Sequence, residues 1–417
     1  MQTQLAPEYR ARPEGLEAEA ILRKCVHCGF CTATCPTYQL LGDELDGPRG
    51  RIYLIKQVLE GEIPTRKTQL HLDRCLTCRN CESTCPSGVQ YGHLVDIGRK
   101  IVDEKVPRPL GEKALRWALK EGLPSPLFAP TMKLGQAVRG LLPAALQAKV
   151  PAPQPAGTWP TRAHARKVLM LAGCVQPAMM PHINSATARV LDAVGIQTVI
   201  APQAGCCGAV KFHLNDQEGG KAEMRANIDA WWPLVEQGGV EAIVMNASGC
   251  GVTVKDYGHT LQADPQYAAK AARISALTRD LSELLPAMLP ELAHQLAGRV
   301  RRTDLRFAYH PPCTLQHGQQ LRGGVETHLN QLGFKLRVAP SESHLCCGSA
   351  GTYSVLQPGL AYPLRDRKLG VLGAAFGEQP PDAILSANIG CIAHLQGGTS
   401  LPVRHWVEVL DEALCAT

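Results

Sequence analysis

The sequence lacks several features that define large classes of proteins. Aromatic residues make up only 5% of its 417 residues, and its net charge is only +6. No uninterrupted apolar run approaches the roughly 18 residues of a transmembrane helix, and the N-terminus has no apolar signal-peptide core. The basic residues are scattered, which argues against a nucleic-acid partner. We therefore expect a globular protein that begins and stays in the cytoplasm.

A nucleotide-binding fingerprint is also missing, because no G-x-G-x-x-G motif opens a helix. Cysteine, in contrast, is abundant, with seventeen residues. A disulfide framework is not expected in a reducing compartment, and the count is odd. Metal binding or thiol redox chemistry is the remaining explanation for these cysteines.

Eight cysteines lie in two short segments near the N-terminus. Residues 25–36 and 75–86 both read Cys-x-x-Cys-x-x-Cys-x-x-x-Cys-Pro, the signature of two-cluster ferredoxins. Three cysteines wrap around one cube of iron and sulfide, whereas the fourth ligates the other cluster. The motifs therefore predict two 4Fe–4S clusters with crossed ligands: Cys25, Cys28, Cys31 and Cys85 for the first, and Cys75, Cys78, Cys81 and Cys35 for the second.

Zinc is the alternative occupant of these eight cysteines. Zinc ribbons separate two Cys-x-x-Cys pairs by about 15–20 residues. Here four cysteines crowd into eleven residues, twice. The spacing therefore favours iron–sulfur clusters over zinc.

The segment between the two motifs is expected to be structural. Pro48 should open a helix that Gly61 ends, with apolar residues on one face. Arg49 and Arg51 either lie near a cluster, where they would raise its potential, or are solvated. His27 is expected to pack beside the first cluster.

The C-terminal part contains an internal repeat. Four cysteines of the first copy recur in the second at offsets of 139 to 141 residues: Cys174, Cys206, Cys207 and Cys250, then Cys313, Cys346, Cys347 and Cys391. Each follows a strand-like run, and helical patterns lie between the runs, which predicts a parallel α/β sheet in each copy. Cysteines just beyond the carboxyl ends of parallel strands should gather at one edge of the sheet.

The second eight cysteines leave several functions open. Four converging thiolates can hold zinc or an iron–sulfur centre, adjacent cysteines can exchange disulfides, and buried cysteines can be inert. His213, His317 and His344 are either additional ligands, proton carriers or structural residues. Cys415 is expected to be an ordinary free thiol.

These patterns together predict a multidomain protein of mixed α+β and α/β class. We expect a helical two-cluster ferredoxin domain (1–105), a proline-rich linker with short helices (106–165) and two repeated α/β Cys-Cys-Gly domains (166–300 and 301–417). The linker helices are expected at 111–121 and 132–148. The second is basic and partly apolar, so it either docks on a membrane surface or packs on the rest of the protein.

This order of motifs resembles the electron-transfer subunits of heterodisulfide reductases, anaerobic glycerol-3-phosphate dehydrogenase and glycolate oxidase. Residues 25–61, 75–90, 343–354 and 387–391 look most like the iron–sulfur subunit of bacterial glycolate oxidase. Residues 40–51, LLGDELDGPRGR, narrow the resemblance to that subunit. The resemblance spans nearly the whole chain apart from the linker.

The resemblance implies partners. A separate flavoprotein subunit would oxidise glycolate to glyoxylate, and this chain would pass the electrons through its clusters towards a quinone at the inner face of the cell membrane. The chain would then have no catalytic residue of its own. The same electron-transfer role could serve a glycerol-3-phosphate or lactate dehydrogenase. The alternative from another functional class is a catalytic disulfide reductase that uses the C-terminal cysteines.

The sequence departs from the fullest form of the family in one respect. That form ends each repeat in Cys-x-x-Cys, whereas this chain has Ala247 three residues before Cys250 and Asn388 three residues before Cys391. Four thiols per copy favour a simpler metal centre or a structural role over the non-cubane cluster of the disulfide reductases.

Overall fold

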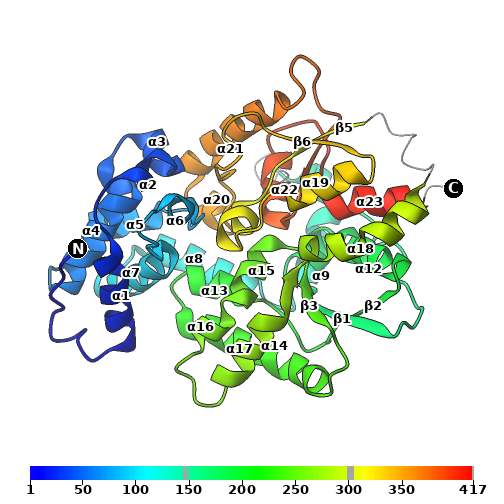
Figure 1. Cartoon of the computed structure of the whole chain (residues 1–417). Helices are drawn as coiled ribbons and strands as arrows, with labels where there is room; N and C mark the ends of the chain where they lie inside the picture. Colours follow the sequence, from blue (N-terminus) through cyan, green and yellow to red (C-terminus); the bar gives the residue numbers. More distant parts are fainter. Residues whose placement is uncertain (144–146, 148–149, 298–304, 416–417) are drawn as a thin grey trace.

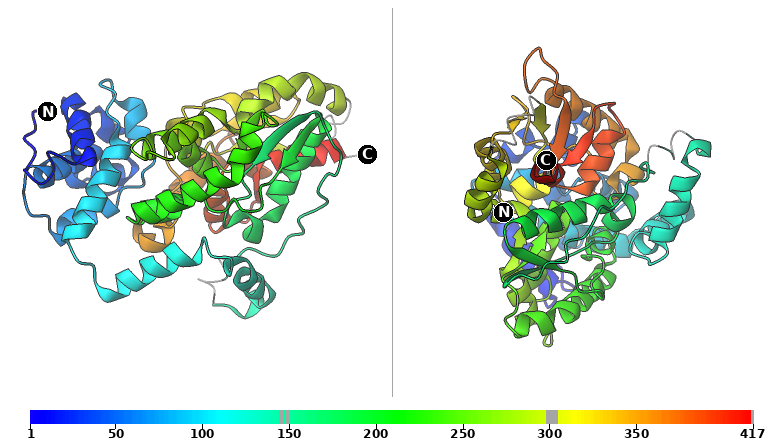
Figure 2. Two further views of the ribbon diagram at one scale, coloured as in Figure 1. Left: turned by 90° about the horizontal axis from the view of Figure 1, so that it is seen from below. Right: turned by 90° about the vertical axis from the view of Figure 1, so that its right-hand side faces the viewer.

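The computed structural model describes the chain except for residues 144–146, 148–149, 298–304 and 416–417, and it shows three parts (Figure 1). A helical block formed by the N-terminal residues lies at one end. Two units that each contain a sheet form the other end, and the linker runs along one side of them (Figure 2). The α+β and α/β multidomain class is thereby confirmed, whereas the domain boundaries stay a prediction.

The N-terminal block is built from short helices around one apolar core. These elements are α1 (Pro13–Lys24), α2 (Phe30–Ala33), α3 (Pro36–Leu41), the 3₁₀ turn η1 (Glu44–Asp46), α4 (Pro48–Leu59), α5 (Arg66–Asp73), α6 (Asn80–Thr84) and α7 (Tyr91–Lys105). Pro48 opens α4 and Gly61 follows its end with φ +107°, as predicted. The apolar face of α4 packs between α1 and α7, so the cysteine motifs are loops held by these three helices.

The first copy of the repeat alternates strands and helices. Its elements are β1 (Arg166–Met170), α11 (Gln176–Met179), α12 (Pro181–Ala193), β2 (Ile196–Val199), α13 (Ala209–His213), α14 (Gln217–Glu236), β3 (Ala242–Met245), α15 (Ser248–Lys255), α16 (Tyr257–Thr260), α17 (Ala268–Leu277), β4 (Thr278–Asp280) and α18 (Leu281–Leu296). All strand pairs are parallel, and the order in the sheet is β2-β1-β3-β4.

The second copy repeats this plan. Its elements are β5 (Arg306–Tyr309), the π-helical turn η4 (Thr314–Gly318), α19 (Gly324–Gln331), β6 (Lys335–Val338), α20 (Tyr353–Leu356), α21 (Pro358–Gly373), β7 (Ala383–Ser386), α22 (Ile389–Gln396), β8 (Val403–His405) and α23 (Trp406–Cys415). The sheet order is β6-β5-β7-β8, again parallel. The predicted parallel sheets are therefore confirmed.

Sequence reasoning missed the last strand of each sheet. β4 and β8 are only three residues long, too short for a periodic pattern. Each runs directly into a helix whose first turn is capped in the same way: Glu283 accepts from the N–H of Asp280 (2.7 Å), and Glu408 accepts from the N–H of His405 (2.7 Å). The shared spacing of the capping box is the signal that reveals these elements.

The two copies form one continuous body. The largest apolar core includes Val168 and Leu191 from the first copy and Phe307 and Trp406 from the second. At the contact, the N–H of Ser248 donates to the carbonyl of Ala387 (3.0 Å). A shared core and hydrogen bonds between the copies fix the orientation of one cysteine site relative to the other.

The helical block is fastened to the first copy by a small polar interface. The rings of His93 on α7 and His259 on α16 stack with centroids 4.0 Å apart, and Glu17 on α1 lies 2.9 Å from His259 Nε2. Nearby, the Arg79 Nη1 atom lies 3.1 Å from Asp256. The contact therefore combines ring stacking with ion pairs across two parts of the chain.

The linker contains α8 (Leu110–Gly122), as predicted, and α9 (Phe128–Ala137), followed by the turn η2 (Arg139–Leu141). α9 begins four residues before the predicted start at 132, because Pro130 falls in its first turn, where no backbone N–H is needed. Part of the predicted stretch 132–148 lies outside the described residues. Among the residues that the structure describes, no helix combines the length and apolarity needed to cross a bilayer.

The glycine of each Cys-Cys-Gly motif is required by close packing, which yields a stability prediction. Gly348 has φ +89°, and a Cβ there would press on the carbonyl oxygen of Ala361 in α21. We expect Gly348→Ala to lower the free energy of unfolding by about 2–4 kcal/mol, because strain and overpacking add. Thermal and denaturant unfolding measure the loss.

Gly323→Ala is the matched control for this prediction. Gly323 also has a positive φ (+74°), but nothing lies within 4 Å of the added Cβ. Its substitution should cost only about 1 kcal/mol, from the backbone alone. Equal losses in the two variants would show that packing against α21 is unimportant.

Candidate metal centres

The first group of thiols gathers at one small pocket of the N-terminal block. Cys25, Cys28, Cys31 and Cys85 all line it. Burial raises the pKa of Cys31 to about 11, and the thiols of the other three add to the effect. Cys85, sixty residues away from Cys25 in sequence, is thus brought beside the first motif.

Left-handed backbone conformations bend both cysteine loops in the same way. His27 and Gly29 have φ of 58° and 86° in the first motif, and Thr77 and Arg79 have φ of 53° and 59° at the matching positions of the second. Such residues curl the chain so that successive groups face one point. Arg79 keeps this uncommon conformation while its side chain pairs with Glu82 (2.9 Å).

The second group of thiols lies deeper. Burial raises the pKa of Cys81 well above its ordinary value, with contributions from Cys78, Cys75 and Cys35. The Cys75 sulfur accepts hydrogen bonds from the Tyr91 hydroxyl (3.6 Å) and from a backbone N–H (3.4 Å). Cys35, from the first motif, is therefore beside the three leading cysteines of the second.

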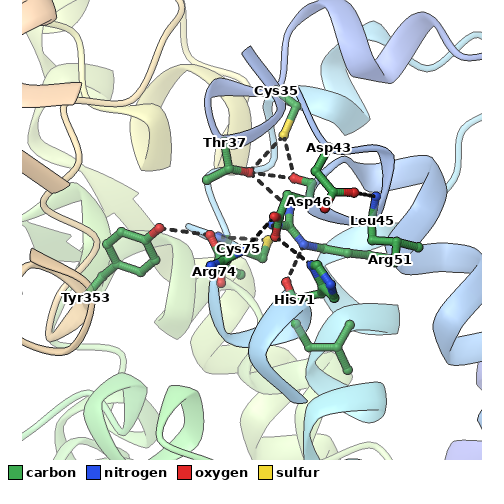
Figure 3. A network of polar contacts seen from close by, with 12 residues as sticks. Cys35, Thr37, Asp43, Leu45, Asp46, Arg51, His71, Arg74, Cys75 and Tyr353 are labelled. Carbon is green, nitrogen blue, oxygen red and sulfur yellow. Dashed lines mark hydrogen bonds and ion pairs between the residues drawn. The ribbon is translucent and has the colours of Figure 1, made fainter. Parts of the chain in front are cut away.

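A buried carboxylate ties the two motifs together (Figure 3). Asp46 is fully buried and lies 2.8 Å from Arg74 Nη1, 3.0 Å from His71 Nδ1 and 3.4 Å from Arg51 Nη2. The hydroxyl of Thr37 donates to the Asp46 carbonyl (2.8 Å). Asp46 and Arg51 both belong to the segment LLGDELDGPRGR. Together with His71 and Arg74 they form a buried polar network between the cysteine loops, which we call the lock.

Arg51 carries a positive charge into this lock. Its side chain is 1% exposed. Burial opposes the charge, but Tyr91, Cys75 and Cys35 outweigh burial and raise the pKa of the guanidinium. Of the two sequence readings for Arg51, proximity to the thiols is the one that the structure shows. Arg49 instead pairs with Glu44 (2.6 Å) and lines the pocket of the first thiol group.

The Cys-Cys-Gly sites lie where an open parallel sheet binds ligands. From β1 the chain continues to β2 on one side of β1 and then returns to β3 on the other side. The strand order therefore reverses between β1 and β3, and open α/β sheets bind ligands at such a point. Cys174 follows β1, and Cys250 lies in the first turn of α15, the helix after β3. In the second sheet, Cys313 and Cys391 have the same places after β5 and β7. The sheet edge thus gathers the thiols, as predicted.

In the first copy, the four thiols lie beside one another in a chain of contacts. Cys206 interacts with Cys174 and Cys207, and hydrogen bonds from both lower its pKa. Cys207 in turn contacts Cys250. A carboxyl group joins them: burial, then the charge of Cys206, raises the pKa of Glu223 to about 7.

The second copy gathers its thiols in the same way but with different neighbours. The sulfurs of Cys313 and Cys346 are 3.7 Å apart, and Cys347 contacts both Cys346 and Cys391. Beside them lies the ammonium group of Lys368, whose side chain is buried. Burial lowers the pKa of Lys368 to about 8, whereas the nearby thiols act in the opposite direction.

The second thiol group of the N-terminal block touches the second Cys-Cys-Gly site. Cys78 packs in one apolar group with Cys313 and Cys346, and Cys313 adds to the burial that raises the pKa of Cys78. The Tyr353 hydroxyl donates to the Arg74 carbonyl (2.9 Å) and closes the contact (Figure 3). Sequence could not reveal this neighbour relation, because more than 230 residues separate Cys78 from Cys313.

The histidines named from the sequence do not join the thiols. His317 has partners on both ring nitrogens, the Ser83 hydroxyl (3.0 Å) and the His344 carbonyl (2.8 Å), so it fastens the helical block to the second copy. His213 is 44% exposed and pairs with Asp96. The structure favours the structural reading for these residues.

One histidine that the sequence reasoning missed lies among the cysteines. A ring nitrogen of His310 and the sulfurs of Cys347 and Cys391 all lie within 4.8 Å of one another. His310 is fully buried, and burial lowers its pKa well below the ordinary value. The signal was its position, directly after a strand and three residues before Cys313.

The donor sets fit iron–sulfur or zinc chemistry. Sixteen cysteines fall into four groups of four along the chain, and no disulfide joins any of the seventeen. Thiolates are the ligands that both kinds of centre use. A cavity of about 1650 Å³ runs between the parts of the chain and is lined by cysteines of the second motif and of both copies, so the sites share one interior.

Comparison with known families assigns these segments. Residues 21–89 match the family described as 4Fe-4S dicluster domain, and residues 168–255 and 307–396 each match the cysteine-rich domain. The matched regions cover more than half of the chain and contain both groups of cysteine motifs.

Relatives match over the full length. The glycolate oxidase iron-sulfur subunit of Escherichia coli (strain K12) is 56% identical over 416 residues, 99% of each chain. The probable glycolate oxidase iron-sulfur subunit of Bacillus subtilis (strain 168) is 30% identical over 95% of this chain and 92% of its own. Lactate utilization protein A of Geobacillus kaustophilus (strain HTA426) is 26% identical over 59% of this chain and 98% of its own.

Proposed function

Since this chain belongs to the family of glycolate oxidase iron–sulfur subunits, we propose that it relays electrons from a partner flavoprotein to a membrane quinone. The flavoprotein oxidises glycolate to glyoxylate, and this chain takes the electrons one at a time. The observation that carries the proposal is the contact of Cys78 with Cys313 and Cys346. It joins the second thiol group of the N-terminal block to the second copy.

The ligand sets follow from the two groups of thiols. Cys25, Cys28, Cys31 and Cys85 hold one 4Fe–4S cluster, and Cys75, Cys78, Cys81 and Cys35 hold the other. Crossed ligation is supported by the closeness of Cys85 to Cys31 and of Cys35 to Cys81. Each iron–sulfur cluster carries one electron at a time, so adjacent clusters suit a relay from a two-electron donor.

The Cys-Cys-Gly sites, Cys174, Cys206, Cys207 and Cys250 and their counterparts Cys313, Cys346, Cys347 and Cys391, hold the remaining metal or redox centres. Their domains are 166–300 and 301–417, after the ferredoxin domain 1–105 and the linker 106–165. A catalytic disulfide reductase would use the same thiols. The contact between Cys78 and the second site favours the relay, because it gives that site an electron source.

The donor substrate is tested with the complete complex. We expect a brown complex that co-purifies with a flavin subunit and whose visible absorption bleaches when glycolate reduces the clusters. Reduction by lactate or glycerol 3-phosphate, and not by glycolate, would mean that the partner is a lactate or glycerol-3-phosphate dehydrogenase. Clusters that no hydroxy acid reduces would refute the relay.

Crossed ligation gives a prediction for single cysteines. Cys35→Ser should damage the cluster held by the second motif, and Cys31→Ser the first, since each serine removes one thiolate ligand. Each variant should lose up to about four of the roughly eight irons of the N-terminal block. Electron paramagnetic resonance with iron analysis distinguishes the two losses.

Cys415→Ser is the control, because Cys415 is exposed and far from both motifs in sequence. It should leave iron content unchanged. Damage to the first cluster in Cys35→Ser, with the second intact, would mean that each motif keeps its own four ligands.

Peripheral attachment to the membrane is assigned to the linker. Leu110 and Trp117 on α8 are 85% and 64% exposed, and Leu127, Leu134 and Leu141 are 71%, 65% and 87% exposed. Leu110 and Trp117, seven positions apart, lie on one side of α8. Leu134 lies in α9, whereas Leu127 directly precedes α9 and Leu141 ends the turn η2. An exposed apolar stripe of this kind is typical of a helix that lies on a lipid surface.

Charge supports the same assignment. Between Glu121 and Asp192 the sequence contains no acidic residue, although Lys133 and Arg139 lie in or beside α9. Basic residues next to an apolar stripe attract anionic headgroups. α9 packs on α11, where the Gln136 side chain donates to the Ala178 carbonyl (3.5 Å). We assign its exposed side to the membrane surface, since α9 has no buried residue.

Vesicle binding tests this assignment. The double variant Leu127→Asp/Leu134→Asp should bind phosphatidylglycerol-containing vesicles at least about tenfold more weakly in co-sedimentation, because two apolar side chains leave the lipid. Ile63→Asp, at a more exposed site on the N-terminal block (87%), should bind normally. Unchanged vesicle binding by the double variant, with loss of the flavin subunit, would assign the stripe to the protein partner instead.

A further inference from the structure

We propose that His310 is a metal ligand of the second Cys-Cys-Gly site, so that the two repeated sites hold different centres. The inference rests on the proposed metal occupancy of that site and adds a nitrogen donor to its four thiols. The first copy has no such donor, because its corresponding residue is Leu171.

The backbone fixes His310 at the edge of the sheet. It directly follows β5, its N–H donates to the carbonyl of Leu385 (2.8 Å), and its carbonyl accepts from the Ser386 hydroxyl (3.0 Å). Hydrogen bonds on both sides of the residue leave little freedom to turn away. The imidazole is thereby held towards the sulfurs of Cys347 and Cys391, within 4.8 Å.

The ring has no other use that the structure shows. His310 is 0% exposed, and neither Nδ1 nor Nε2 has a hydrogen-bond partner among the described residues. Buried polar atoms nearly always have a partner. A neutral imidazole whose nitrogen faces two thiols has the form that binds iron and zinc.

The contrast with the first copy shows that this is a local difference within a common frame. His310 and Leu171 both stand three residues before the first cysteine of their copy. Leu171 is also buried, at 3% exposed, so the first copy fills the same place with an alkyl side chain. The sequence difference therefore changes a donor and leaves the packing position occupied.

A second pair of residues diverges in the same sense. Gly208 and Gly348 face the backbone carbonyls of Gly220 and Ala361, which are therefore equivalent positions of the two copies. Seven residues after these positions, the first copy has Asn227 and the second has Lys368. The second site thus combines a nitrogen donor with a buried ammonium group. These changes bring different charge and different ligand chemistry to two sites with the same four thiols.

The test is pulsed electron paramagnetic resonance on the full chain, purified anaerobically with ¹⁵N-labelled histidine. We expect a strongly coupled ¹⁵N nucleus at one centre and its loss in His310→Leu, which copies the first site. Cobalt(II) exchanged into the site gives the same readout if the native metal is zinc. Metal analysis should show the content of that one centre reduced in His310→Leu.

Two further variants keep the test decisive. Tyr309→Phe removes a neighbouring buried hydroxyl that also lacks a hydrogen-bond partner among the described residues, and it should keep both metal and ¹⁵N coupling. If His310→Leu does not fold, His310→Cys should retain the metal through sulfur and lose the coupling.

A loaded second site without ¹⁵N coupling, or a His310 variant with unchanged metal content and spectrum, would overturn the assignment. The signals of the two N-terminal clusters are read in the same sample. Their absence would refute the proposed relay, whereas their presence beside an unchanged His310 variant would refute only this inference.

Discussion

The buried carboxylate of Asp46 fixes the two N-terminal cysteine loops relative to each other. Asp46 has no access to water, and Arg51, Arg74 and His71 supply the charge and hydrogen bonds that its burial requires. These partners come from α4 and from the end of α5, which lie between the two cysteine loops in the sequence, so the loops cannot separate without leaving charges buried and unpaired. The carbonyl of Arg74 also accepts from Tyr353 of the second copy. The same lock therefore reaches from the ferredoxin motifs to the repeat.

The repeat shows how one frame can support two different sites. Strand order, capping and the Cys-Cys-Gly turn are the same in both copies, since each is needed to form the sheet edge. The residues around the thiols are free to differ. Glu223 adds a carboxyl group to the first site, whereas Lys368 and His310 add an ammonium group and an imidazole to the second. The second site touches Cys78, which makes it a neighbour of the ferredoxin block.

Much of the fold could be predicted because its signals are local. Six strands were visible as apolar runs before cysteines, and α4 was visible from Pro48 and its apolar face. β4 and β8 were missed because three residues show no period. α9 begins earlier than expected because Pro130 lies in its first turn, where a missing backbone N–H interrupts no hydrogen bond of the helix.

The sequence by itself determined the kind of metal centre in the N-terminal block, because the spacing of cysteines along the chain limits how they can bind. Three cysteines at intervals of three residues can bind one cluster when the chain forms a tight loop around it. The sequence also determined the repeat and the kinship with glycolate oxidase iron–sulfur subunits. Only the tertiary structure decided which sites are neighbours and which side chain completes them. Cys78 meets Cys313, and His310 meets Cys347, through docking and strand order. Such contacts between distant residues depend on how layers pack, and no local pattern in the chain encodes them.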